Sequence, residues 1–257
     1  EFHHWIKQEI LGCLRGKSKL DIEEWIEELR YKKSGNPTIR NTLLAFNIAT
    51  LQLKSNSKPF SRELASERYL RFPFDRYKTE SWDIEHIHSV QSLMPQKKQD
   101  MKSWLEVHQK ELFNTLKISL PEIDKSIEQL LEVLRSDTPL SQEHNQQFKD
   151  VYDALLRQFS GYGSEERDNV ELDINNIGNL TLLNTSLNRS YGNALFPIKR
   201  LKVIEADKSG QFCPLCTTNA FLKYYSEHVD NVLHWTINDI QDHKNSISSA
   251  LHQFFSS

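Results

Sequence analysis

Glycine and proline are scarce in this sequence, with eight of each among 257 residues. A fold of many short strands needs both residues in its tight turns, so their scarcity argues against an all-β fold and for a mostly helical one. Cysteine is also rare, with only Cys13, Cys213 and Cys216. An odd, low count gives no disulfide framework and is typical of a protein from a reducing cytoplasm.

Long apolar runs and a strong net charge are missing as well. No run approaches the roughly 18 apolar residues that a membrane-spanning helix needs, so we expect no membrane association. The start, residues 1–5, shows no signal peptide and no initiator methionine, from which we expect a larger parent protein and a cytoplasmic location. The net charge of −3 means that any nucleic-acid role needs a local basic face, a metal or another domain.

Apolar residues recur at helical spacing over most of the chain and suggest three parts. Residues 1–80 form a helical N-terminal part, in which Asp21 is expected to cap a helix that runs to about Lys33. Residues 81–210 hold two strand-like segments, and 211–257 form a C-terminal helical part. The polar, charged stretch from about residue 95 to 160 is either a helical insertion between two halves of a site or a set of ordinary packing helices.

The segment 81–89 reads Ser-Trp-Asp-Ile-Glu-His-Ile-His-Ser and places two acids and two histidines within six residues. The alternation of polar and apolar side chains predicts a strand. A carboxylate beside a histidine is the chemical minimum of a metal-assisted hydrolase, because the acid binds a divalent cation and the imidazole takes a proton from water. The alternative is an ordinary strand with polar residues on one face.

Residues 180–193 predict a short buried strand followed by a short helix. Two strands packed on a helix, with a cation between them, form the ββα-metal site of HNH nucleases. In such a site His86 is the general base, and Glu85 and Asn188 supply oxygen ligands to Mg²⁺ or Mn²⁺. Asn179 holds the imidazole of His86 in the required orientation.

Asp83 and His88 are further candidates for this site. By strand alternation His88 faces the same side as His86, where it is either a second ligand, a phosphate contact or a spare group. Alternation also puts Glu85 and His86 on opposite faces, so the strand must end or twist there for both to reach one metal.

Four basic residues follow the second strand and are candidates for contacts to DNA phosphates. They are Arg189, Lys199, Arg200 and Lys202. The alternative for each is a solvated helix face.

Cys213 and Cys216 have the spacing of half a zinc site. The second half would have to come from histidines such as His228 or His234. Small apolar cysteines packed beside aromatic residues are the better explanation, so we expect no zinc.

Taken together, several motifs resemble the C-terminal HNH domain of GmrSD-type restriction proteins. They are Arg71-Phe72-Pro73-Phe74, Trp82-Asp83-Ile84-Glu85-His86-Ile87, Ile177-Gly178-Asn179-Leu180-Thr181-Leu182-Leu183, Leu187-Asn188-Arg189-Ser190, Pro197 and Phe221-Leu222-Lys223-Tyr224-Tyr225. The resemblance runs from about residue 40 onward. One departure is that His86-Ile87-His88-Ser89 stands where the family often has His-Ile-x-Pro.

The resemblance implies a mostly α fold with a small β component, a helical domain built around a ββα-metal (HNH) nuclease core. It implies a metal-dependent endonuclease that hydrolyses DNA phosphodiester bonds in bacterial defence against phages, often on modified DNA. It also implies a partner, an N-terminal ParB-like nucleotide-hydrolysing domain or subunit. The alternative is a catalytically inactive DNA-binding or interaction module, against which the joint presence of Glu85, His86, Asn179 and Asn188 argues.

Overall fold

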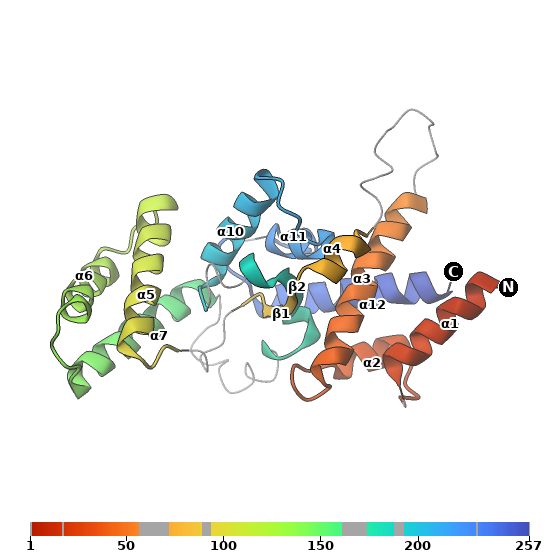
Figure 1. The fold of residues 1–257 in the computed structure, drawn as a ribbon, viewed down its shortest axis with the longest axis horizontal. Coiled ribbons are helices and arrows are strands. Elements are labelled where there is room, and N and C mark those ends of the chain that lie inside the picture. Colours follow the sequence, from red (N-terminus) through yellow and green to blue (C-terminus); the bar gives the residue numbers. More distant parts are fainter. Residues whose placement is uncertain are drawn as a thin grey trace.

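The computed structural model describes residues 2–16, 18–56, 72–88, 94–160, 174–187, 193–229 and 231–256. Most of these residues are helical, and the described strands form one two-stranded sheet, so the prediction of a mostly α fold with a small β component is confirmed. The molecule is elongated, with the sheet near its middle (Figure 1). None of the described helices is long and apolar enough to cross a membrane.

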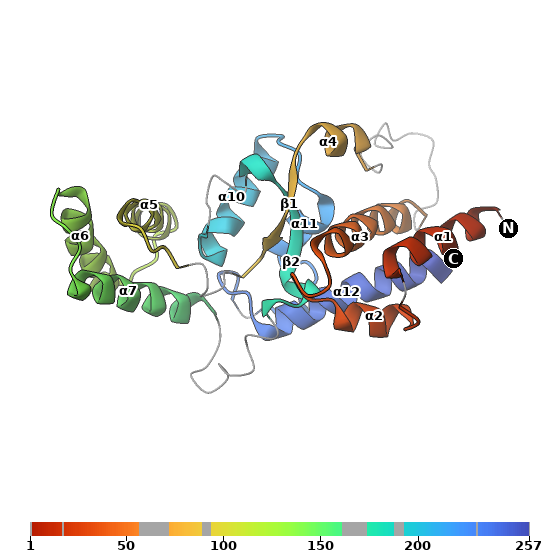
Figure 2. The same ribbon diagram turned by 60° about the horizontal axis from the view of Figure 1, so that its bottom comes forward.

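Helices from both ends of the chain pack together at one end of the molecule. They are α1 (Phe2–Arg15), α2 (Ile22–Glu28), α3 (Asn36–Asn56) and α12 (Ile237–Ser256), and the short helix α4 (Phe74–Thr79) precedes the sheet. Helix α12 lies against α1, α2 and α3 (Figure 2), and Trp25, Phe46 and Leu251 are part of their common core. The parts expected at 1–80 and 211–257 therefore share one core.

Helix α2 begins as predicted, because the Asp21 carboxylate accepts a hydrogen bond from the backbone N–H of Glu24 at 2.8 Å. It ends at Glu28 and not near Lys33. The apolar pattern continues, but the backbone of residues 29–31 leaves the helix and bonds to residues 175–177 instead.

The sheet pairs β1 (Trp82–His86) with β2 (Leu180–Asn184) in antiparallel register, with His86 opposite Leu180. The 3₁₀ helix Ile177–Asn179 leads into β2. Helices α10 (Phe196–Lys208) and α11 (Leu215–Phe221) follow the sheet along the chain. Helix α11 is fixed to β2, because Thr217 Oγ1 donates to the Leu182 carbonyl at 2.6 Å.

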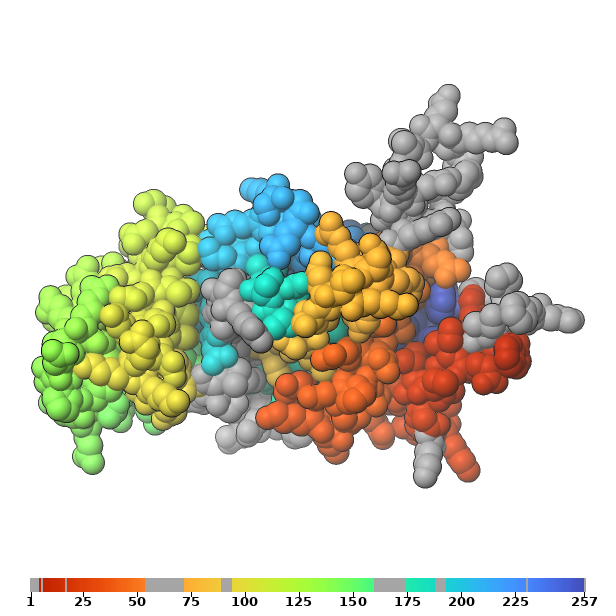
Figure 3. Space-filling model, viewed as in Figure 1, coloured from red at the N-terminus to blue at the C-terminus, as the bar shows by residue number. Residues whose placement is uncertain are grey.

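The polar stretch between the two strands is helical, as predicted. It consists of α5 (Lys98–His108), the π-helix Gln109–Thr115, α6 (Pro121–Arg135) and α7 (Gln142–Ser160). These helices form the other end of the molecule, coloured yellow to green in Figure 3. They are tied to the segment before α10, since the Leu195 N–H donates to His108 Nε2 at 3.3 Å and Trp104 Nε1 donates to the Asn193 carbonyl at 3.3 Å.

Gly178 allows α12 to approach the 3₁₀ helix directly. A Cβ atom at Gly178 would lie 2.1 Å from the carbonyl oxygen of Ile240, which is backbone and cannot rotate away. The carbonyl of Gly178 also bonds to Nδ1 of the buried His243 at 2.8 Å. The position thus requires glycine because of close contact between two backbones.

We expect Gly178→Ala to lower the free energy of unfolding by about 1–3 kcal/mol, the usual range for overpacking, as measured by urea denaturation. Gly12→Ala is the matched control, because a Cβ at Gly12 meets nothing within 4 Å and Gly12 lies inside α1. The control is expected to be neutral or stabilising, since alanine is the better helix former. Equal effects of the two substitutions would contradict this account.

Two buried histidines predict a loss of stability in acid. Burial lowers the pKa of His108 to about 3 and that of His243 to about 4. In the unfolded chain a histidine titrates near pH 6.5, so below that pH the unfolded state binds more protons than the folded state. The free energy of unfolding should therefore fall between pH 6.5 and 5, by on the order of 1–2 kcal/mol for each histidine. A urea midpoint that does not change over this range would show that the imidazoles protonate without cost.

Candidate functional site

His86 ends strand β1 with its imidazole half-buried between two neighbours. The side chain of Asn175 hydrogen-bonds the imidazole, and the ring of Tyr31 meets it edge-on with 4.7 Å between centroids. Nε2 is buried and has no hydrogen-bond partner within the described part of the chain. Burial, and next the charge of Lys199, lower the pKa of His86 to about 4. The imidazole is therefore neutral at pH 7, with Nε2 free to accept a proton.

Lys199 reaches β1 from the first turn of α10 and lies inside the protein, 1% exposed. Its Nζ is 2.5 Å from Oε1 of the buried Glu85 and 2.7 Å from the carbonyl oxygen of His86. Neither of the two expectations for Lys199, a contact to DNA phosphates or a position on a solvated helix face, fits this buried position. A buried ammonium needs a partner of opposite charge, and Glu85 supplies it.

Glu85 and His86 contact different elements. The carboxylate of Glu85 bonds to α10, whereas the ring of His86 touches Tyr31 and Asn175. This division follows strand alternation, which points neighbouring side chains to opposite faces. The described contacts do not direct both side chains toward one cation.

Asn179 is placed differently from the prediction that it orients the imidazole. Its Oδ1 accepts from the backbone N–H of His88 at 2.8 Å, and its Nδ2 donates to the carbonyls of His88 and Ile174 at 3.3 and 2.9 Å. Asn179 thus holds the backbone beyond β1, while Asn175 bonds to the ring of His86. Sequence reasoning missed Asn175 because a short 3₁₀ helix, Ile177–Asn179, has no recognisable period of apolar residues. The turn that places Asn175 beside the end of β1 is therefore not predicted.

His88 and Asp83 occupy opposite ends of the strand region. His88 is fully buried, and burial, followed by the charges of Lys199 and His86, lowers its pKa to about 3. His88 is thus close to both groups and neutral at pH 7. Asp83 accepts a hydrogen bond from Thr185 Oγ1 at 3.0 Å, near the start of β1.

The remaining basic candidates are not free cations on one face. Nζ of Lys202 lies 3.0 Å from carboxylate oxygens of both Glu111 and Glu205. Arg200 is half-buried, and burial lowers its pKa. The two other predicted site residues, Asn188 and Arg189, lie outside the described residues.

The donor set for a divalent cation fits in part. One carboxylate, that of Glu85, is present but bonded to Lys199, and the Nε2 of His86 is a buried atom without a partner among the described residues. No group of three or more His, Cys, Asp or Glu side chains is placed to hold a metal ion in the ranges that the structure describes. Asn188, the other expected ligand, lies outside them.

Cys213 and Cys216 pack against different cores. Cys216 belongs to the core of the terminal helices, and its N–H donates to Oδ1 of Asn47 at 3.0 Å. Cys213 packs against the core around α10, and burial raises the pKa of its thiol to about 12.

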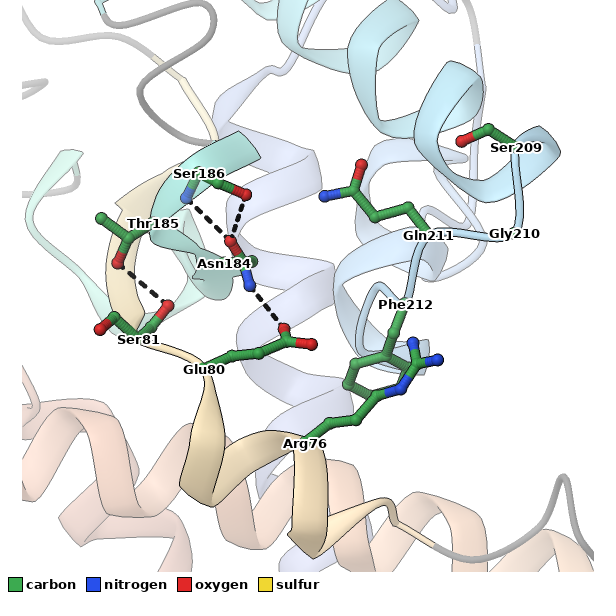
Figure 4. A pocket seen from close by; sticks show the side chains of 10 residues that line it. All are labelled: Arg76, Glu80, Ser81, Asn184, Thr185, Ser186, Ser209, Gly210, Gln211 and Phe212. Atoms are coloured by element: carbon green, nitrogen blue, oxygen red, sulfur yellow. Dashed lines mark hydrogen bonds between the residues drawn. The ribbon is translucent and has the colours of Figure 1, made fainter.

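A cavity of about 780 Å³ (Figure 4) lies beside the start of β1 and the end of β2, whereas His86 is at the opposite end of β1. Its lining residues come from α4, the end of β2 and the turn before α11: Arg76, Glu80, Ser81, Asn184, Thr185, Ser186, Ser209, Gly210, Gln211 and Phe212. Asn184 donates to Glu80 and accepts from Ser186 Oγ at 2.6 Å. These bonds fix the start of the segment that leads toward residue 188.

The buried pair of Glu85 and Lys199 predicts strong energetic coupling. Lys199→Met leaves a buried carboxylate alone, and Glu85→Gln leaves a buried ammonium alone, so each should cost about 3–5 kcal/mol in urea denaturation. The double variant should lose less than the sum of the two, which a double-mutant cycle measures. Arg135→Met, which breaks the solvent-exposed pair with Glu106, is the control with an expected cost below about 1 kcal/mol. Additive losses for Glu85 and Lys199 would refute the coupling.

Comparison with known proteins gives one match. Residues 139–250 match the family model for GmrSD restriction endonucleases, C-terminal domain. The match covers β2, α10, α11 and most of α12, whereas β1 lies outside it. Neither curated proteins nor solved structures gave a match. The resemblance predicted from the motifs is confirmed for this part of the chain: residues 139–250, somewhat less than half of the sequence, are similar to the C-terminal domain family of the GmrSD restriction endonucleases.

Proposed function

We propose that this chain is a DNA endonuclease domain of the HNH type, which hydrolyses phosphodiester bonds with His86 as the general base. Similarity to a restriction endonuclease family supports a function related to restriction. The observation that carries the chemistry is the buried Nε2 of His86, which has no hydrogen-bond partner in the described chain.

The surroundings of His86 keep its imidazole in the unprotonated form that a general base requires. With a pKa of about 4 the imidazole is neutral at pH 7, and the bond to Asn175 leaves Nε2 as the basic nitrogen. A water molecule held at Nε2 can give up its proton as it attacks phosphorus.

We extend the proposal to a divalent cation, Mg²⁺ or Mn²⁺, with Glu85 and Asn188 as its ligands. Such a cation would supply charge stabilisation on the phosphate and its leaving oxygen. Glu85 must then either give up its bond to the ammonium of Lys199 or bind the cation through its other carboxylate oxygen. Asp83 and His88 remain further candidates, and no zinc is proposed.

For the whole protein we propose a cytoplasmic restriction enzyme that acts on foreign, often modified, DNA. An N-terminal ParB-like nucleotide-hydrolysing domain or subunit is its proposed partner. The match of residues 139–250 to a restriction endonuclease family supports the restriction function.

A second candidate is a DNA-binding module that has lost its chemistry. The bond between Glu85 and Lys199 favours it, because a carboxylate that already has a cationic partner binds a metal less readily. This candidate requires DNA binding by the wild type without cleavage in Mg²⁺ or Mn²⁺.

We expect His86→Ala to reduce plasmid nicking by at least about 100-fold, the usual contribution of a general base. EDTA should abolish the wild-type activity, and Mg²⁺ or Mn²⁺ should restore it. His252→Ala, an exposed histidine on α12, is the control and should nick like the wild type. Thermal melting should show that both variants are folded. Equal nicking by the wild type and a folded His86→Ala variant would rule out His86 as the base.

A further inference from the structure

The turn between α2 and α3, residues 29–34, lies directly against the proposed base. Its Tyr31 touches the His86 ring, and the Tyr31 N–H donates to the Asn175 carbonyl at 2.8 Å. Arg30 pairs with Asn176 as an isolated β-bridge. The segment that holds the His86 imidazole is thus the same segment that fixes this turn.

The turn presents two basic side chains to solvent, Lys32 and Lys33. Neither forms an ion pair with a carboxylate among the described residues, in contrast to Lys199 and Lys202. The Nζ of Lys32 lies 5.8 Å from the centroid of the Tyr31 ring, and its charge contributes to the low pKa of the imidazole. These two residues are therefore cations without carboxylate partners beside the site.

Lys32 has a left-handed backbone, with φ of 63°. For a residue other than glycine this conformation costs about 1–2 kcal/mol and persists only where neighbouring bonds enforce it. The bonds of Arg30 and Tyr31 to residues 175 and 176 provide that enforcement. The strain fixes the direction in which the two lysines leave the turn.

A cavity of about 890 Å³ runs along the same turn. Tyr31 and Asn175 form the part of its wall nearest His86, and Arg15, Arg30 and Lys33 add positive charge. The acidic residues in the wall are Glu27 and Glu28, of which Glu27 is paired with Lys244 at 2.5 Å. Cationic groups thus predominate in the wall.

We propose that the turn 29–34 is a contact surface for the DNA backbone, in which Lys32 and Lys33 bind phosphates next to the bond that His86 cleaves. This inference rests on the proposed function. Asn175 and Asn176 bond to the turn, and Asn175 also bonds to the imidazole of His86. A phosphate bound at the turn therefore keeps a fixed distance from the base. It also gives the acidic chain the local basic face that DNA binding requires.

The test is the salt dependence of DNA binding by the full chain in a His86→Ala background, where cleavage does not interfere. The plot of log K against log salt concentration has a negative slope, and each lost phosphate contact makes this slope shallower by about 1. We therefore expect Lys32→Met/Lys33→Met to weaken DNA binding several-fold and to make the slope shallower by about 1–2. Replacing both lysines by arginine, which keeps the charges, should restore the wild-type slope.

The matched control is Lys125→Met/Lys149→Met, which removes the same charge from exposed positions on α6 and α7. Its slope should equal that of the wild type. If the turn variant and this control behave alike while the enzyme nicks DNA, the inference is overturned and the proposed function stands. If the wild-type chain does not bind DNA, both are overturned.

Discussion

One buried ammonium holds the candidate site together. Lys199 from α10 bonds to the carboxylate of Glu85 and to the carbonyl of His86, so a single group fixes a helix to the end of β1. A buried charge without its partner is costly, so the ammonium and the carboxylate depend on each other. Burial, and next this same charge, lower the pKa values of His86 and His88, so both imidazoles are neutral at pH 7.

The segment 174–179 makes the other contacts that hold the site. Asn179 holds the backbone beyond β1, Asn175 bonds to the imidazole of His86, and Gly178 admits the backbone of α12. The site therefore lies where the N-terminal turn, the middle strands and the C-terminal helix meet. This explains why a protein with only two described strands can hold one histidine so closely.

The sequence reveals the helices of the stretch 95–160 and the last helix, because each has a clear helical period of apolar residues. It reveals the second strand as a short apolar run. It does not reveal the burial of Lys199, since a lysine among charged neighbours on a helix normally faces solvent. Nor does it separate Asn175 from Asn179, because their roles depend on a 3₁₀ turn. The turn 29–34 is missed because long-range backbone bonds to residues 175–177 outweigh the local helical pattern.

The two paired strands are separated by about ninety residues of chain, which has a consequence for folding kinetics. Closing so long a loop is entropically unfavourable, whereas α5, α6 and α7 contact one another locally and can form first. Once folded, this helical unit shortens the effective loop and brings β2 within reach of β1. His86, Asn175 and Lys199 then meet only late, so a chain still emerging from the ribosome cannot assemble the site until α10 has been synthesised.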